Sequence, residues 1–144
     1  METAPINGLT GLAYLPDHFD RNAQEELLAS IRAIVAEAPL FQPVMPKTGK
    51  AFSVKMSNCG PLGWVSDIKS YRYQPLHPDT GKPWPAMPTV LRDLWAELAP
   101  DALPPEACLI NRYTTGARMG LHQDKDEQDL SAPIVSISLG APIT

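Results

Sequence analysis

The stretch ACLINRYTTGARMGLHQDKDEQDLSAPIVSISLG, residues 107–140, carries most of the information about the fold. It contains three β-like segments, at residues 107–113, 118–124 and 134–139. Residues 114–116, Thr-Thr-Gly, are suited to a turn that joins the first two. Three such segments in sequence predict strands of a common β-rich core.

Two helices are expected before this stretch. Asp20 is a good N-cap for the first, which should end near Glu37 because Pro39 disfavours helical geometry in the residue before it. The second should cover residues 89–99 and stop at Pro100. Both have apolar residues at helical spacing: Leu27, Leu28, Ile31, Ile34 and Val35, then Leu91, Leu94, Trp95 and Leu98. These apolar stripes should be buried.

The remaining segments predict short strands and loops. Residues 12–15 form a short apolar run before Pro16. Residues 41–87 are rich in proline, glycine and lysine, with alternating runs such as residues 51–56. The expected fold class is therefore mainly β with flanking helices, an α+β protein.

Length and composition indicate one globular domain. The chain has 144 residues, of which 44% are hydrophobic and 19% charged. No apolar run reaches the roughly 18 residues of a membrane span, and the N-terminus does not resemble a secretory signal. Cys59 and Cys108 are expected to be reduced thiols rather than a disulfide. These features predict a cytoplasmic protein.

Charge is unevenly distributed. The whole chain has a net charge of −4. Residues 40–83 contain six cations and two anions, a local net charge of +4: Lys47, Lys50, Lys55, Lys69, Arg72 and Lys82 against Asp67 and Asp79. This segment is either a phosphate-facing surface or a chance cluster on solvated loops.

The sequence His122-Gln123-Asp124 has the spacing of a metal site. In an extended chain, side chains two apart point to the same face, so an imidazole and a carboxylate converge on one cation. Non-haem iron(II) oxygenases use two histidines and one carboxylate. A solvated loop that happens to contain a histidine is the alternative.

The strand before this motif presents two polar side chains on one face. Asn111 and Tyr113 share that face by the same period of two. An amide and a phenol can hydrogen-bond a small dicarboxylate beside a metal. The alternative is a strand with its polar residues on the solvent side.

Several motifs together resemble one enzyme family. They are ACLINRY (107–113), LHQDKDE (121–127), APIVS (132–136), MSNCG (56–60), LGW (62–64) and KPWPAMP (82–88). These motifs, in their order along the chain, resemble those of the AlkB family of iron(II)/2-oxoglutarate-dependent nucleic-acid dealkylases, and in particular the bacterial members. The resemblance extends over nearly the whole chain after about Gly11.

The resemblance implies roles for ten residues. His122 and Asp124 would bind iron(II), and Asn111 and Tyr113 would contact 2-oxoglutarate. The implied substrate contacts belong to a nucleotide-recognition lid and to the base pocket: Trp64, Tyr71, Met56 and Ser57 in the lid, Asp126 and Glu127 beside the pocket. For Tyr73, packing beneath a proline-rich loop is the preferred interpretation.

The implied fold is a partial double-stranded β-helix, or jelly roll, with a nucleotide-recognition lid. Residues of about 40–87 would form the lid and residues of about 107–144 the start of the core. The family needs a second histidine ligand and an arginine for 2-oxoglutarate, and neither residue type occurs after Asp124. His18 and His77 do not match ligand positions. We therefore expect a single incomplete, C-terminally truncated domain.

The implied activity is oxidative demethylation of N-alkylated bases in DNA, or alternatively RNA. It would use iron(II), O2 and 2-oxoglutarate and release formaldehyde, succinate and CO2. The substrate would be a single strand or a damaged duplex, because the base must leave the stack. The protein would be a monomer when complete. Two alternatives remain: a non-catalytic remnant that binds single-stranded nucleic acid, and a plain jelly-roll module.

Overall fold

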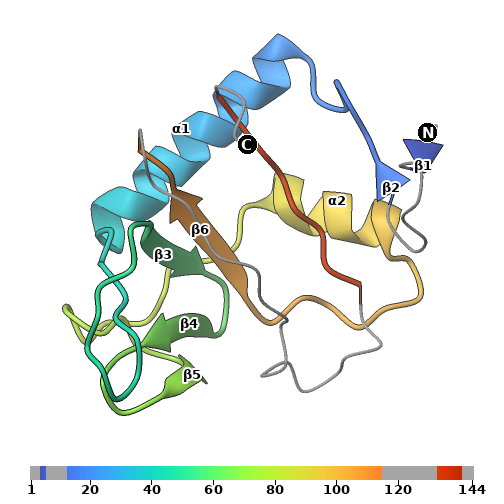
Figure 1. Ribbon diagram of the computed structural model, residues 1–144. Coiled ribbons are helices and arrows are strands. Elements are labelled where there is room, and N and C mark those ends of the chain that lie inside the picture. Colours follow the sequence, from blue (N-terminus) through green and yellow to red (C-terminus); the bar gives the residue numbers. More distant parts are fainter. Residues whose placement is uncertain (1–3, 6–12, 115–132, 141–144) are drawn as a thin grey trace.

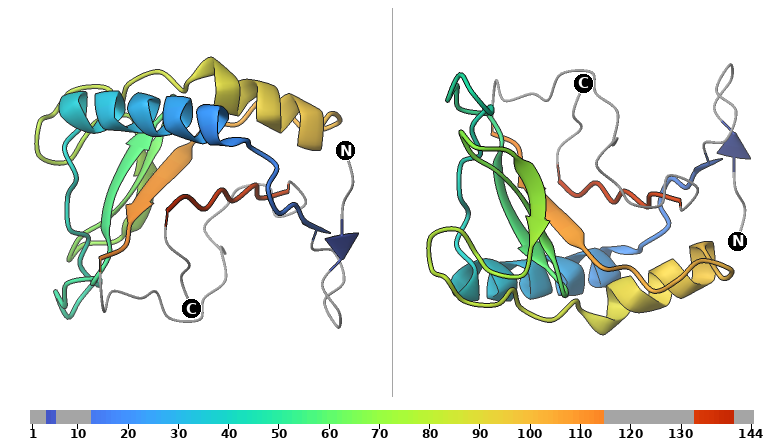
Figure 2. Two further views of the ribbon diagram at one scale, coloured as in Figure 1. Left: turned by 90° about the horizontal axis from the view of Figure 1, so that it is seen from above. Right: turned by 90° about the horizontal axis from the view of Figure 1, so that it is seen from below.

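The computed structural model describes residues 4–5, 13–114 and 133–140. Its elements follow the order β1-β2-α1-β3-β4-β5-α2-β6 (Figure 1). Helices α1 and α2 lie in one layer, roughly one beyond the other, and strands β3 to β6 lie on one side of this layer (Figure 2). The β1 (Ala4–Pro5) and β2 (Ala13–Tyr14) strands form a separate antiparallel pair, so the predicted short strand at 12–15 is confirmed.

Helix α1 spans Arg21–Glu37 and begins as predicted. The side chain of Asp20 accepts a hydrogen bond of 2.8 Å from the backbone N–H of Ala23. Such a cap satisfies one of the free N–H groups at a helix start. Leu27 and Ile34 are buried, whereas Leu28 is 38% exposed. The buried stripe is therefore narrower than the sequence suggested.

Helix α2 spans Thr89–Leu98, one residue shorter than predicted. Of its expected stripe only Leu94 is buried, and the other three side chains are half-buried. The indole N–H of Trp95 donates to the carbonyl of Leu103 at 2.9 Å, which ties the helix to the following turn. Among the described residues, no helix is long and apolar enough to span a membrane.

Two antiparallel strand pairs position the candidate site. The β3 (Lys55–Cys59) and β6 (Cys108–Arg112) strands pair along five residues, from Lys55 opposite Arg112 to Cys59 opposite Cys108. The β4 (Gly63–Ser66) and β5 (Tyr71–Gln74) strands form the second pair. The predicted strand at 107–113 is confirmed, and regular pairing of β3 starts later than the alternating run at 51–56 suggested.

The core lies between these strands and the residues that follow α1. Its buried members are Ala38, Phe41, Val54, Met56, Val65 and Trp84. Trp84 lies directly over Gly63, where an added Cβ would come within 2.1 Å of the indole ring. The indole N–H of Trp84 also donates to the carbonyl of Gln74 at 2.9 Å. Gly63 thus allows the indole to pack against the β4–β5 pair.

The two cysteines face each other across the β3–β6 ladder as free thiols, as predicted. Cys59 is completely buried. The neighbouring Cys108 thiol and the burial both raise the pKa of Cys59, so it stays protonated at neutral pH.

One predicted strand is wrong as stated. Residues 134–139 are described, but they form no strand. Ile134 is 67% exposed, whereas Val135, Ile137 and Leu139 are half-buried between exposed serines. The alternation is that of a strand, but an extended segment becomes a strand only when a neighbour supplies a hydrogen-bonding ladder. No described residue does so. The predicted strand at 118–124 lies outside the described residues.

The α+β class is confirmed, with a smaller β component than expected in the described residues. The five-residue ladder joins β3, from the predicted lid, to β6, from the predicted core. The division into a lid at about 40–87 and a jelly-roll core at about 107–144 therefore stays a prediction.

Candidate functional site

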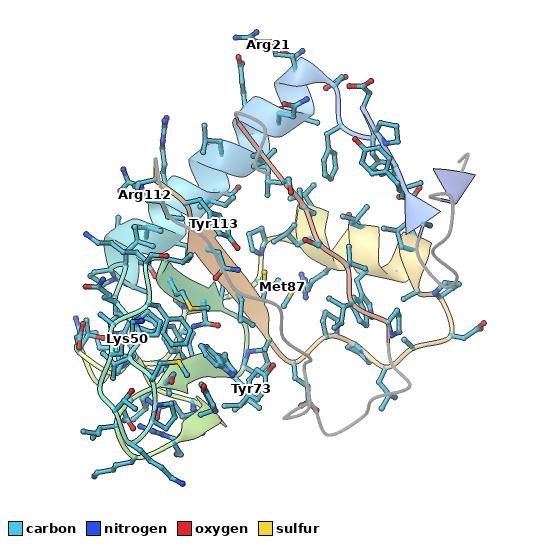
Figure 3. All side chains as sticks on the ribbon, in the orientation of Figure 1. Arg21, Lys50, Tyr73, Met87, Arg112 and Tyr113 are labelled. Carbon is cyan, nitrogen blue, oxygen red and sulfur yellow. The ribbon has the colours of Figure 1, made fainter. Side chains whose placement is uncertain are left out.

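Strand β6 and the residue that follows it contain the two predicted co-substrate contacts, Asn111 and Tyr113. Asn111 is exposed and lies opposite buried Met56 in the ladder. Tyr113 follows two residues later, half-buried, and packs against the core. Figure 3 shows Tyr113 beside Arg112 at the end of β6. Neither the Asn111 amide nor the Tyr113 hydroxyl has a hydrogen-bond partner among the described residues, so both fit the role of contacts to a dicarboxylate.

The predicted iron ligands His122 and Asp124 lie outside the described residues, as do Asp126 and Glu127. Elsewhere in the described part of the chain, no three His, Cys, Asp or Glu side chains cluster in a way that could hold a metal. The fit to iron(II) therefore rests on donor chemistry: an imidazole and a carboxylate two residues apart. Their roles remain predictions.

His77, which the sequence analysis did not assign to a metal, has a structural role. Its Nδ1 accepts backbone N–H bonds from Asp79 at 3.0 Å and Thr80 at 3.2 Å. The other nitrogen, Nε2, must then carry the proton that it shares with the carbonyl oxygen of Pro39 at 2.7 Å. The ring is 2% exposed. Both nitrogens are thus occupied, and neither is available to a cation.

Trp64 and Tyr71 are the two lid aromatics predicted to lie near a base. Their rings stack, with centroids 5.7 Å apart and an interplanar angle of 22°. The ring of Phe52 also contacts the indole of Trp64, with ring centroids 6.2 Å apart. Tyr71 is 43% exposed and Trp64 is half-buried. The structure therefore brings the two predicted aromatics together on the β4–β5 pair.

Asn58, which sequence reasoning missed, holds the backbone of Trp64. Its amide nitrogen donates to the Trp64 carbonyl at 3.1 Å, and its oxygen accepts from the Trp64 N–H at 3.0 Å. The side chain is fully buried. Since a buried amide has to find partners, an asparagine within a predicted strand was the available signal.

Met56 and Ser57 lie in β3 and are buried, with 1% and 0% of their surfaces exposed. Met56 belongs to the core cluster. The hydroxyl of Ser57 donates to the carbonyl of Ala38 at 2.7 Å, just beyond α1. The packing gives both side chains a structural role, and it does not support the direct substrate contact that was predicted for them.

The lysines of the basic segment, residues 40–83, are exposed. All five of its lysines are on the surface: Lys47, Lys50, Lys55, Lys69 and Lys82. Arg72 is instead paired with Asp67, with 2.7 Å between Nη2 and Oδ2. The Arg72 guanidinium holds the pKa of the Asp67 carboxyl well below its usual range. The excess of cations in this segment is thus carried by side chains that a polyanion can reach.

Comparisons with known proteins identify the family of the chain. Residues 11–144 match the 2OG-Fe(II) oxygenase superfamily. The chain belongs to this family. It is 46% identical over 140 residues to an "Alpha-ketoglutarate-dependent dioxygenase AlkB homolog" of Caulobacter vibrioides, and 49% identical over 128 residues to the "Alpha-ketoglutarate-dependent dioxygenase AlkB" of Escherichia coli.

These alignments cover 97% and 86% of the chain, and 63% and 59% of the two relatives. The chain thus spans about three fifths of the length of these bacterial oxygenases. A more distant relative is the "DNA N(6)-methyladenine demethylase ALKBH1C" of Arabidopsis thaliana, 27% identical over 154 residues, with 90% of this chain and 33% of that protein covered. Membership of the 2OG-Fe(II) oxygenase superfamily implies iron(II) and 2-oxoglutarate as cofactor and co-substrate.

Proposed function

We propose that this 2OG-Fe(II) oxygenase removes alkyl groups oxidatively from nitrogen atoms of nucleic-acid bases. The observation that carries the proposal is the stack of Trp64 on Tyr71 within residues 40–83, the basic segment whose lysines are exposed. Aromatic rings beside cations are the composition of a single-strand binding surface. The names of the relatives, AlkB dioxygenase and DNA demethylase, point to the same substrate class.

The residues divide into three roles. His122 and Asp124 would hold iron(II), and Asn111 and Tyr113 would orient 2-oxoglutarate through their amide and phenol groups. Trp64 and Tyr71 would support the base, with Asp126 and Glu127 beside it. Iron and 2-oxoglutarate, when bound, supply the oxidation that hydroxylates the N-alkyl carbon.

The chemistry balances with O2 as the oxidant. One oxygen atom enters the methyl group as a hydroxyl, and the other enters succinate as 2-oxoglutarate loses CO2. The hydroxymethyl group then leaves as formaldehyde and its proton returns to the base nitrogen. The chain's own contribution is to bind and orient both substrates.

The proposed substrate is single-stranded or damaged DNA, with RNA as the alternative. A base inside a duplex cannot reach a metal in a protein, so an unpaired or weakened base is favoured. We further propose that the protein is a monomer and acts in the cytoplasm.

The test follows two products at once. The chain is incubated with iron(II), 2-oxoglutarate and a 1-methyladenine oligonucleotide, and both succinate and the repaired base are quantified. These 144 residues contain only two of the expected ligands, so we expect them alone to release no succinate above a protein-free control. In a form that also contains the second histidine and the arginine, Asp124→Ala should lose both products, because it removes an anionic ligand. The exposed Asp101→Ala variant is the matched control. Equal and measurable activity of Asp124→Ala and the unaltered protein in that form would exclude the proposed metal site.

A second candidate function is binding of single-stranded nucleic acid without turnover. It rests on the Trp64–Tyr71 stack and the exposed lysines alone, since these need no metal. Tight binding of the methylated oligonucleotide would favour this candidate if no succinate above a protein-free control is released even by a form that contains the second histidine and the arginine.

A further inference from the structure

Two cations face each other at the end of the β3–β6 ladder. Lys55 and Arg112 are directly opposite in the antiparallel register. With Ser53 and Thr114 they line a hollow of about 190 Å³. One water needs roughly 10–15 Å³ of such space, so a tetrahedral phosphate group fits. The described lining consists of two cations and two hydroxyl groups.

This pairing is unfavourable unless something neutralises it. Like charges directly opposite in an antiparallel pair are destabilising. Within the described part of the chain, neither Lys55 nor Arg112 forms an ion pair or a side-chain hydrogen bond. Both side chains are exposed at this site. An anion bound between them would relieve the repulsion, and solvent screening keeps the cost small when none is bound.

The hollow is not the proposed 2-oxoglutarate site. Directly paired residues lie on one side of a ladder, and neighbours along a strand alternate. Asn111 shares its side with Met56, whereas Arg112 shares its side with Lys55. Tyr113 returns to the side of Asn111. The anion held by Arg112 and Lys55 would therefore be a different group from the one held by Asn111 and Tyr113.

We propose that Lys55 and Arg112, with Ser53 and Thr114, bind a backbone phosphate of the nucleic-acid strand. The guanidinium fork matches two phosphate oxygens, the ammonium adds a point charge, and the hydroxyls can donate further hydrogen bonds. The identity of the ligand as a nucleic-acid phosphate rests on the proposed function. The geometry of the basic pair, Lys55 and Arg112, is independent of that function.

The hollow is close enough to the aromatic stack to serve the same strand. Lys55 precedes Asn58 by three residues of β3, which is about 10 Å at roughly 3.3 Å per residue. Asn58 in turn holds the backbone of Trp64. Ser53 directly follows Phe52, whose ring contacts Trp64. Asn58 lies on the Met56 side of β3, opposite to Lys55, so a strand with a base at Trp64 would pass around the end of the ladder to place a nearby phosphate between Lys55 and Arg112.

The experiment measures how salt weakens binding of an unmodified single-stranded oligonucleotide, by fluorescence anisotropy. Each phosphate contact contributes about 0.7 to the slope of log affinity against log salt for single strands. Because the two cations hold one phosphate, we expect the double variant Lys55→Gln/Arg112→Gln to lower the slope by about 0.7, and each single variant to lower it by less. The control Arg21→Gln removes the same charge from the far end of α1 (Figure 3), where the side chain is 90% exposed. The Arg21→Gln variant should keep the affinity and the salt slope of the unaltered chain.

Two further arms identify the ligand. A methylphosphonate oligonucleotide, which has an uncharged backbone, should bind the unaltered chain and the double variant equally. In the second arm, inorganic phosphate is added stepwise and the NMR chemical shifts of the Arg112 guanidinium group are followed. If phosphate saturates the hollow while the double variant binds DNA as the unaltered chain does, the ligand is a free phosphate and the nucleic-acid assignment is wrong.

The proposal is overturned if the double variant keeps both the affinity and the salt slope, or if the unaltered chain does not bind the oligonucleotide. None of these measurements needs iron or turnover. Absence of succinate release from a form that also contains the second histidine and the arginine would therefore count against the proposed dealkylation without deciding the phosphate site.

Discussion

The indole of Trp64 lies nearly parallel to the phenol ring of Tyr71, at 22° and with 5.7 Å between the ring centroids. The register explains this contact. Trp64 is directly opposite Tyr73, so Tyr71 occupies the diagonal position on the same side of the β4–β5 pair. Large rings reach such diagonal neighbours. The stack is thus built into the strand pairing before any base arrives.

Replacement of the stacked rings should weaken nucleic-acid binding. Stacking of a base on an aromatic side chain is worth roughly 1–3 kcal/mol, or about ten- to a hundredfold in affinity. We expect a loss in this range for Tyr71→Ala and Trp64→Ala, measured by anisotropy on a single-stranded oligonucleotide. Tyr14→Ala, which removes a ring that is 57% exposed on β2, is the matched control.

The two variants also separate binding from folding. Tyr71 is largely exposed, so its replacement should leave the thermal transition almost unchanged, whereas Trp64 also packs against the core. Slow 2-oxoglutarate turnover without nucleic acid should survive in both variants if the full activity is present. Equal loss of turnover and of repair in Trp64→Ala, at unchanged folding, would place Trp64 in the metal pocket instead.

Asn58 should act as a positioning residue for this stack. Asn58→Ala removes both hydrogen bonds to the Trp64 backbone, at a cost of about 0.5–1.5 kcal/mol for each. Asn58→Asp keeps the acceptor but sets a carboxylate against the Trp64 carbonyl, so it should be no better than alanine. The readout is the tryptophan near-ultraviolet circular dichroism, together with oligonucleotide affinity. An unchanged spectrum in both variants would mean that the strand pairing alone fixes Trp64.

The elements that local rules determine were predictable. Asp20 caps α1 as expected, Pro39 follows its end, and β6 falls inside the predicted segment at 107–113. Capping, proline geometry and apolar periodicity act within a few residues, so the sequence contains them directly. The aromatic pair was also predictable in composition, but its stacked geometry depends on the register between β4 and β5.

Features set by distant contacts were not predictable. The burial of Met56 and Ser57 depends on the packing of β3 against Ala38 and Phe41. The hollow between Lys55 and Arg112 exists only because β3 and β6 pair in one particular register, and a shift by one residue would separate the cations. Residues 134–139 have the alternation of a strand but find no ladder partner among the described residues, which no local pattern reveals.

Ser57 should therefore behave as a structural residue. Ser57→Ala removes the hydroxyl that donates to the Ala38 carbonyl and leaves that acceptor buried, at a cost of about 1–3 kcal/mol. Oligonucleotide affinity of the folded protein should not change. Urea unfolding gives the free energy of unfolding, and Ser136→Ala, which removes an exposed hydroxyl, is the comparison. A large loss of affinity at unchanged stability would restore the predicted substrate contact.

The pair of Asp67 and Arg72 should make stability depend on pH in one direction. Arg72 lowers the pKa of the Asp67 carboxyl below its ordinary value of 3.8. The stabilisation is therefore present above about pH 4 and is lost as the pH falls through the lowered pKa of the folded protein. Arg72→Gln should raise the pKa of Asp67 towards 3.8, as followed by carboxyl NMR titration. If the titration of Asp67 is the same in both proteins, the ion pair does not persist in solution.

Gly63→Ala should destabilise the fold through one contact. The new Cβ would come within 2.1 Å of the Trp84 indole, and the atoms it meets belong to a rigid buried ring rather than to a flexible side-chain end. Overpacking of this kind costs about 1–3 kcal/mol, and this contact belongs at the upper end of that range. The measurement is a double-mutant cycle by urea unfolding, with Gly63→Ala made in the unaltered chain and in Trp84→Phe. A smaller ring leaves more room, so the alanine should cost less in the second background even though Trp84→Phe loses the hydrogen bond to Gln74. Equal costs in the two backgrounds would show that the indole is not what limits the size of the residue at position 63.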